Sequence, residues 1–149
     1  MSQRSLVTVI LLLLLLLGIG EGEQNVLVKS ADNCSGQIVS KIGEDYIPSI
    51  GKTYLVVDIE IKNNGYDTLF PVSPSYFAVL VDGNQYYNSY ATYGLDTALK
   101  MPHLTDTELG NGNSIKGYIA FEIPQGSSKK YELKYAGRTG WNVLVDKCP

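Results

Sequence analysis

Alternation of apolar and polar side chains at every second position constrains the fold of this chain more than any other feature of its sequence. In residues 54–62, the side chains of Leu55, Val57, Ile59 and Ile61 fall on one face of an extended chain. This is the two-residue period of a half-buried strand. The other face, which we expect to be solvated, carries Tyr54, Val56, Asp58, Glu60 and Lys62. The turn Asn63-Asn64-Gly65 then ends the strand, because these residues tolerate positive φ.

The rest of the chain repeats this pattern in short segments. Further strands are predicted over residues 26–30, 37–42, 76–81, 85–88, 115–123, 131–135 and 141–145. Asp82-Gly83 favours a tight hairpin turn between two of them. Seven or eight short strands with no helical period predict an all-β fold, an antiparallel β-sandwich or barrel. The long segment 94–113 lacks a strand pattern, and we expect its leucines and Met101 to fold it back onto the sandwich.

Composition excludes some classes of function. The length of 149 residues corresponds to about one domain. The formal net charge is −3, whereas a nucleic-acid-binding protein needs a dense basic face. One histidine and two cysteines supply few ligands for a metal site. We therefore expect no nucleic-acid partner and no cofactor.

The first segment is predicted to direct export. Residues 6–19 form an apolar run of 14 residues, shorter than the roughly 20 residues of a membrane-spanning helix. Gly18 and Gly20 place small residues where signal peptidase requires them. Residues 1–20 are thus predicted to be a signal peptide, with an uncleaved membrane anchor as the alternative, and residues 25–149 the folded domain. The protein is expected to be extracellular or at the cell surface, touching the membrane only through an uncleaved first segment.

Both cysteines, Cys34 and Cys148, lie in the exported part. In an oxidising compartment, two cysteines in one small domain are expected to form a disulfide. A redox-active pair is the alternative, but such pairs use close Cys-x-x-Cys spacing, which is absent here. Asn33-Cys34-Ser35 fits the N-glycosylation rule. We favour an unmodified Asn33 because the disulfide restricts access to it.

Several motifs, in this order, resemble the strands and turns of one extracytoplasmic family. They are residues 48–58 (PSIGKTYLVVD), Asn63-Asn64-Gly65, residues 73–77 (SPSYF) with Asp82-Gly83, residues 117–124 (GYIAFEIP) and residues 131–135 (YELKY). Over residues 25–136 the chain is similar to domain of unknown function 4352, a family of immunoglobulin-like domains on secreted proteins and lipoproteins of bacteria and archaea.

The resemblance implies an immunoglobulin-like β-sandwich, related in fold to a secreted mycobacterial immunoprotective antigen. The chain departs from the family pattern at Asn111-Gly112, where Pro-Gly is usual, and in its tail, residues 138–149. It also lacks the lipid-modified cysteine that many members carry after the signal peptide. The family has no established catalytic residues, so the resemblance implies none here.

Residues 83–94 combine four tyrosines with Asn, Ser, Thr and Gly. Binding loops use this composition, because tyrosine gives a large amphipathic contact at low entropic cost. Tyr86, Tyr87, Tyr90 and Tyr93 therefore form a candidate binding surface for a sugar or a protein. In the alternative reading, Tyr86 or Tyr87 packs in an edge strand and the other tyrosines cover the long loop.

His103, Asp106 and Glu108 are weak candidates for a metal site or a catalytic site. A metal would need their ligand atoms to converge within about 2.0–2.6 Å of one point, and a solvated polar loop is more common. Asp58 and Glu60, about 7 Å apart along one strand, could act as a carboxylate pair for glycoside hydrolysis. No Gly-x-Ser-x-Gly elbow accompanies the histidine. We therefore predict no catalytic residues and no metal site.

Together these features predict a secreted or cell-surface immunoglobulin-like domain that is not an enzyme. We expect it to be a binding module for a protein or glycan of the cell envelope. Two alternatives stay open: a metal-binding or enzymatic domain built on the His103 loop, and a passive structural component of the envelope.

Overall fold

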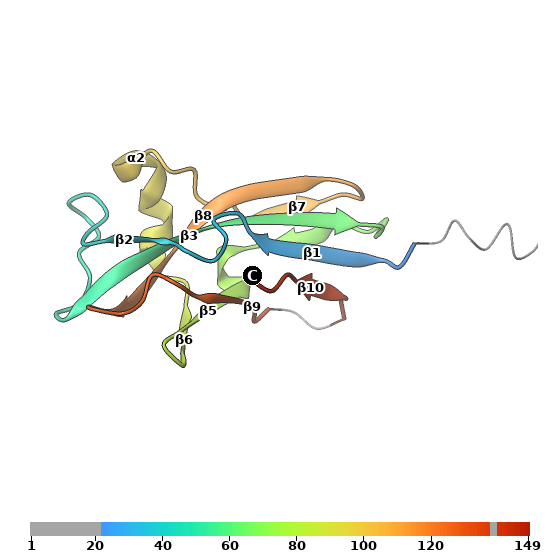
Figure 1. Cartoon of the computed structure of the whole chain (residues 1–149). Helices are drawn as coiled ribbons and strands as arrows, with labels where there is room; N and C mark the ends of the chain where they lie inside the picture. The colour runs from blue at the N-terminus through green and yellow to red at the C-terminus, as the bar shows by residue number, and fades with distance from the viewer. Residues whose placement is uncertain (1–21, 138–139) are drawn as a thin grey trace, which may run out of the picture.

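Two long antiparallel strands, β3 (Lys52–Asn64) and β8 (Ser114–Pro124), pair along their whole length and run through the middle of the molecule (Figure 1). The structure is a computed structural model, and it describes residues 22–137 and 140–149. The predicted signal peptide, residues 1–20, lies outside the described residues. Strand β3 contains the predicted segment 54–62 and ends in the Asn-Asn-Gly turn.

Three short strands complete the sheet around this pair. Strands β1 (Asn25–Ser30) and β2 (Gln37–Val39) follow one another along the same edge of β3, both antiparallel to it. Strand β10 (Val143–Val145) pairs with β1 in parallel. The chain between β1 and β2 forms a loop over residues 31–36, and this loop contains Cys34.

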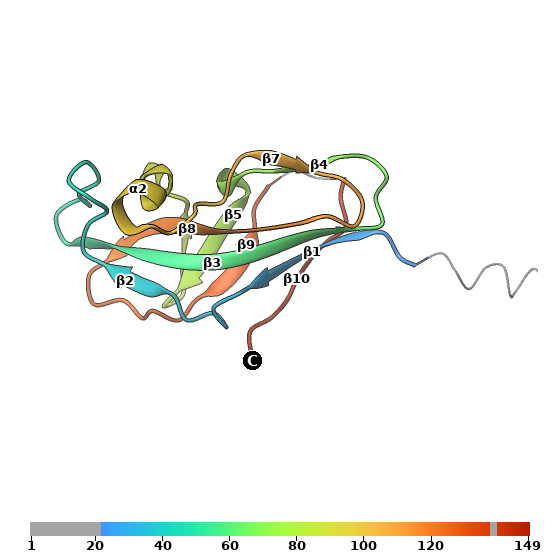
Figure 2. The ribbon, with the colours of Figure 1, turned by 90° about the horizontal axis from the view of Figure 1, so that it is seen from above.

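A second sheet packs against one face of the first. It has the order β6 (Asn84–Tyr87), β5 (Phe77–Val81), β9 (Glu132–Tyr135), and in Figure 2 its strands β5 and β9 run steeply across β3 and β8. The predicted Asp82-Gly83 turn joins β5 to β6, and both of its residues have positive φ. The short strands β4 (Phe70–Val72) and β7 (Thr107–Leu109) form a separate pair.

The main core lies between the two sheets. The predicted inward residues of β3, from Leu55 to Ile61 at alternate positions, are fully buried there. They meet Phe77 and Val79 of β5 from the second sheet. The predicted alternation thus identifies the inner face of β3 correctly.

A second apolar cluster covers part of the opposite face of β3, and it corrects the expectation that this face is solvated. Tyr54 and Val56 are 4% and 1% exposed. They are covered by Ile42, Ala91 and Leu95, which come from two segments distant in sequence.

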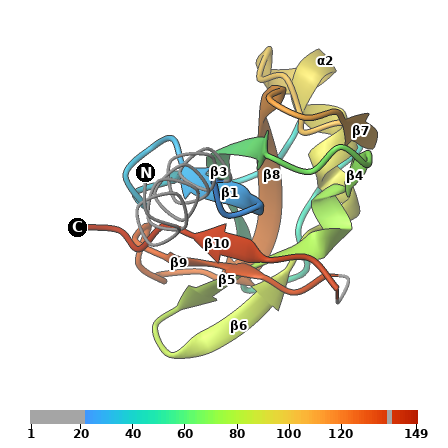
Figure 3. The ribbon, with the colours of Figure 1, turned by 90° about the vertical axis from the view of Figure 1, so that its right-hand side faces the viewer.

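Two short helices hold this cover in place. They are the 3-10 helix η3 (Tyr90–Gly94) and helix α2 (Leu95–Leu99). Figures 1 and 3 place α2 on one side of the β3–β8 pair and strands β5, β6 and β9 on the other. Segment 94–113 therefore does fold back onto the sandwich, but part of it is helical and covers the outer face. Another 3-10 helix, η2 (Pro74–Tyr76), precedes β5.

The all-β sandwich is confirmed, with differences in detail. The described ranges contain ten strands rather than seven or eight, because β4 and β7 add three residues each. The β1–β10 pair is parallel within an otherwise antiparallel arrangement. Within residues 22–137 and 140–149, the search for membrane spans finds no helix of sufficient length and hydropathy.

The predicted disulfide between Cys34 and Cys148 is present, with its Cα atoms 5.9 Å apart. It ties the end of the chain to the loop at residues 31–36. Asp32 holds this loop in place, because its carboxylate accepts hydrogen bonds from the Cys34 and Asp58 amides and from the Tyr131 phenol. Burial, and then the bond to Asp32, raise the pKa of that phenol.

Candidate functional site

The second half of the tyrosine-rich segment 83–94 begins with a capped turn at Ser89, which fixes which of its side chains face outward. The Ser89 hydroxyl accepts a hydrogen bond from the Ala91 amide and caps η3. The buried Thr92 hydroxyl accepts the Ala120 amide of β8 at 3.0 Å. Because Ala91 and Thr92 are buried, Tyr90 is directed to the surface and is 74% exposed.

Tyr46 joins this segment from a loop much earlier in the chain. Its carbonyl accepts the Ile42 amide at 3.0 Å, which closes the loop 42–46. Its ring lies directly on the backbone of Gly94, where a Cβ atom would overlap the ring. Glycine at this position therefore allows the loop and the helix to approach one another closely.

Four aromatic side chains then form a continuous row across the surface. The ring centroids are 6.1 Å apart for Tyr46 and Tyr90, 5.5 Å for Tyr90 and Tyr93, and 5.3 Å for Tyr93 and His103. We call Tyr46, Tyr90, Tyr93 and His103 the aromatic row. The two tyrosine pairs are tilted and the Tyr93–His103 pair is edge to face, so the rings are packed against their neighbours before any ligand arrives.

Two carboxylates hold one end of the aromatic row. Asp96 of α2 accepts hydrogen bonds from the backbone amide of His103 and, at 2.7 Å, from its Nδ1 atom. The Tyr93 phenol donates to Asp106 at 3.2 Å. Burial, followed by the charge of Asp106, raises the pKa of that phenol above its ordinary value. The neutral phenol therefore persists as a hydrogen-bonding group.

A depression of about 360 Å³ lies beside the aromatic row, between loop 42–46 and α2. We call it the tyrosine pocket. It is lined by Ile42, Gly43, Glu44, Asp45, Tyr46, Tyr93, Gly94, Thr97 and Ala98. Two tyrosines, two acidic residues and a threonine thus line one space, and the pocket can offer both apolar and polar contacts.

The structure divides the four predicted tyrosines into two groups. Tyr90 and Tyr93 lie together in the aromatic row. Tyr86 and Tyr87 lie on the edge strand β6: Tyr86 packs against the main core, whereas Tyr87 is 62% exposed. No ring contact among the described residues joins them to the row. Sequence reasoning missed Tyr46, because a lone tyrosine in a polar loop carries no signal of its eventual neighbours.

The structure separates the predicted metal candidates. His103 belongs to the aromatic row and Asp106 borders it, but the His103 Nδ1 atom bonds to Asp96 whereas the Asp106 carboxylate bonds to the Tyr93 phenol. Glu108 is exposed on β7, opposite Pro71. Within the described ranges no three histidine, cysteine or acidic side chains are grouped in a way that could hold a metal ion.

The carboxylates of β3 have structural partners. Asp58 is 8% exposed and pairs with Lys116 at 3.2 Å, whereas Glu60 pairs with Lys29 at 3.3 Å. Burial raises the pKa of Asp58 against the opposing effect of Lys116. Asp58 is thus a buried residue of the sheet, contrary to the solvated face that its sequence pattern predicts.

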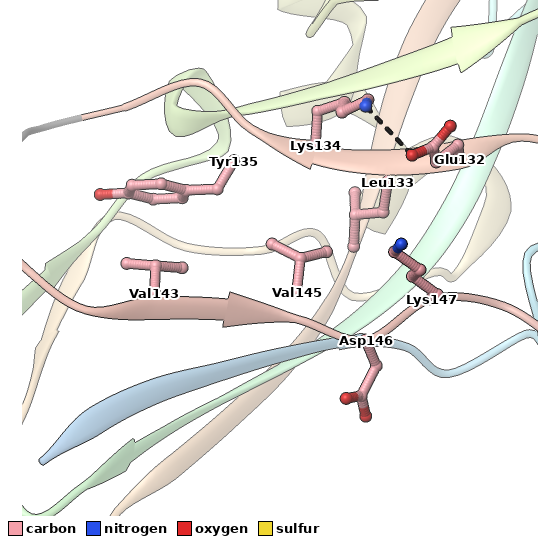
Figure 4. A pocket seen from close by; sticks show the side chains of 8 residues that line it. All are labelled: Glu132, Leu133, Lys134, Tyr135, Val143, Val145, Asp146 and Lys147. Atoms are coloured by element: carbon pink, nitrogen blue, oxygen red, sulfur yellow. Dashed lines mark ion pairs between the residues drawn. The ribbon is translucent and has the colours of Figure 1, made fainter. Parts of the chain in front are cut away.

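A second depression, of about 230 Å³, separates β9 from β10 (Figure 4). The side chains of Leu133, Tyr135, Val143 and Val145 point into the space between the two strands. Leu133 belongs to the buried core, and the other three pack against it. This groove is therefore an opening at the edge of the main core.

Comparison with known proteins gives matches for the fold. A family model described as domain of unknown function (DUF4352) matches residues 20–143. A search of curated proteins gave no match. Among solved structures, the crystal structure of a "putative lipoprotein (ycdA)" from Bacillus subtilis subsp. subtilis strain 168 is similar, with a TM-score of 0.52 and 20% sequence identity. The alignment covers 85% of this chain and 36% of the Bacillus chain, and at this identity the likeness concerns the fold alone.

Proposed function

The chain belongs to the DUF4352 family of domains of unknown function, and from this premise we propose that it is a non-enzymatic binding module of the cell envelope. The aromatic row and the tyrosine pocket are its contact surface. The observation that carries this proposal is the packed row of rings from Tyr46 to His103, which gathers aromatic side chains from three segments of the chain.

Pre-packed tyrosines favour binding for two physical reasons. A tyrosine buries a large area on contact while losing few rotamers. Rings already held by neighbours lose even less conformational freedom when a ligand covers them. Tyr90 is 74% exposed and Tyr93 36% exposed, so both have surface left to bury against a partner.

Three features support a location outside the cytoplasm. Residues 1–20 are predicted to be a signal peptide. The disulfide between Cys34 and Cys148 is the kind of bond that persists in oxidising compartments. The Bacillus protein that shares the fold is described as a lipoprotein. We infer a secreted or cell-surface protein.

The ionisable groups considered for catalysis have contacts that hold the fold together. His103 is held at Nδ1 by Asp96, and that contact fixes the loop against α2. Asp58 is compensated by Lys116 within the sheet. These contacts orient structural elements, which is the work expected of them in a binding module.

The test measures saturable binding of the labelled full-length chain to envelopes isolated from the producing organism. We expect the double variant Tyr90→Ala/Tyr93→Ala to bind at least about tenfold more weakly, because truncating aromatic residues central to an interface commonly costs more than 1 kcal/mol each. Its melting temperature should fall only modestly, since Tyr90 is 74% exposed and Tyr93 gives up one hydrogen bond, to Asp106.

Tyr87→Ala is the matched control, because Tyr87 is a similarly exposed tyrosine outside the aromatic row. It should bind like the unmodified chain. Unchanged binding by the double variant, or a loss of binding that only follows a fall in melting temperature, would instead support a passive structural component.

A further inference from the structure

The tyrosine pocket has walls that suit one class of ligand. Tyr46 and Tyr93 line it, together with the acidic residues Glu44 and Asp45. No lysine, arginine or histidine is among its nine lining residues. The space, about 360 Å³, lies within the usual size range of small-molecule sites.

Both carboxylates are available to a ligand. Glu44 contacts Lys41 at 2.8 Å, but both side chains are exposed, at 87% and 51%. Such surface pairs contribute little and exchange readily with other partners. No hydrogen bond or ion pair in the described part of the chain engages the carboxylate of Asp45.

The surroundings of the pocket extend its negative charge. Asp96 and Asp106 lie along the neighbouring aromatic row, and the fields of nearby carboxylates add at a concave surface. The Tyr93 phenol donates its proton to Asp106, so its oxygen can still accept a hydrogen bond from a ligand.

From this arrangement we propose that the tyrosine pocket binds an organic ammonium group. The tyrosine rings attract a cation through their negative faces, and the carboxylates of Glu44 and Asp45 neutralise its charge. An anion would be repelled by the same groups. This inference rests on the proposed function and names the chemistry of the ligand that the surface recognises.

The experiment is an NMR titration of the ¹⁵N-labelled full-length chain with two pairs of probes. Choline is compared with 3,3-dimethylbutan-1-ol, its uncharged isostere, and n-butylammonium with butan-1-ol. We expect the cations to shift amide signals of residues 43–46 and 94–98 and to bind at least about fivefold more tightly than their neutral counterparts. That ratio corresponds to one charge pair about 4 Å apart in water.

The two cations distinguish the source of the ammonium group. Tighter binding of choline assigns the pocket to a quaternary head group, whereas tighter binding of butylammonium assigns it to a lysine-like amine. Equal binding of each cation and its neutral counterpart, or shifts confined to other parts of the chain, would overturn the inference.

Charge-neutralising variants test the same inference without truncating the fold. Glu44→Gln/Asp45→Asn should lower cation affinity at least about fivefold and leave the affinity for neutral probes unchanged. Asp146→Asn, which removes an exposed carboxylate beside the groove between β9 and β10, is the matched control and should have no effect. Equal cation affinity in all three proteins would overturn the inference.

The envelope-binding assay separates the two proposals. If the cations fail to bind, but envelope binding still depends on Tyr90 and Tyr93, the ammonium assignment is wrong and the proposed function stands. If envelope binding does not depend on these tyrosines, the proposed function fails, whatever the cations do.

Discussion

Gly94→Ala probes the contact that builds the tyrosine pocket. Gly94 has φ −92° and ψ −8°, a conformation that alanine adopts without strain. The added Cβ atom, however, would lie 2.5 Å from Cδ2 of Tyr46 and closer still to another ring atom. The ring must therefore move, and its loop 42–46 must move with it.

Two opposing effects set the magnitude. Overpacking of this kind costs about 1–3 kcal/mol, whereas replacing glycine at a compatible backbone position stabilises by about 0.4–1 kcal/mol through the unfolded chain. We expect Gly94→Ala to lower the free energy of unfolding by about 1–2 kcal/mol. In a Tyr46→Ala background the ring is absent, and the same substitution should be neutral or stabilising.

Urea unfolding of the four proteins in this double-mutant cycle measures the coupling between the two residues. We expect a coupling of about 1–3 kcal/mol. Gly110→Ala is the control: its Cβ would first meet Asn113 at 3.4 Å, an ordinary contact, and it should change stability little. An equal loss from Gly94→Ala with and without the Tyr46 ring would refute the packing described here.

Three further predictions concern the scaffold. Replacing Cys34 and Cys148 by serine opens a loop of 114 residues and should lower the unfolding free energy by up to about 4–5 kcal/mol. In the unmodified chain, thiol labelling of the denatured, unreduced protein should find no free thiol, and two labelled cysteines would contradict the bridge. Thr92→Val leaves the buried Ala120 amide without its partner and should cost about 1–3 kcal/mol in thermal or urea unfolding. Burial raises the pKa of Asp58 above 3.8, so the folded chain binds a proton at this carboxylate more tightly than the unfolded chain. The free energy of unfolding therefore falls as the pH rises from 3.8 through the raised pKa of the folded chain. Asp58→Asn should therefore flatten this part of the pH profile of urea unfolding, and an unchanged slope would contradict it.

The local side-chain pattern was sufficient to predict the inner face of β3 and the turn between β5 and β6. The alternation in residues 54–62 places four apolar side chains on one face, and all four are buried. The Asp82-Gly83 turn occurs where predicted, because both residues tolerate the positive φ that a two-residue hairpin needs. With only two cysteines in the chain, the disulfide could also be predicted without knowing the fold.

The burial of the outer face of β3 depended on residues far away in the sequence. Tyr54 and Val56 alternate as an exposed face would, yet Ile42 and Leu95 cover them. The spacing of Leu95 and Leu99 is that of one helical turn, but a helix of five residues is too short for its period to be recognised. The three-residue strands β4 and β7 escaped prediction for the same reason.

By itself, the sequence determined which segments are extended and where two of the turns fall, because these properties follow from side-chain period and backbone preference over a few residues. Only the tertiary structure decided that Tyr46 lies on Gly94 and that Tyr93 lies beside His103. Those contacts join segments that are independent in the unfolded chain. They form only when burial of Tyr54 and Val56 brings loop 42–46 and α2 together on the outer face of the sheet.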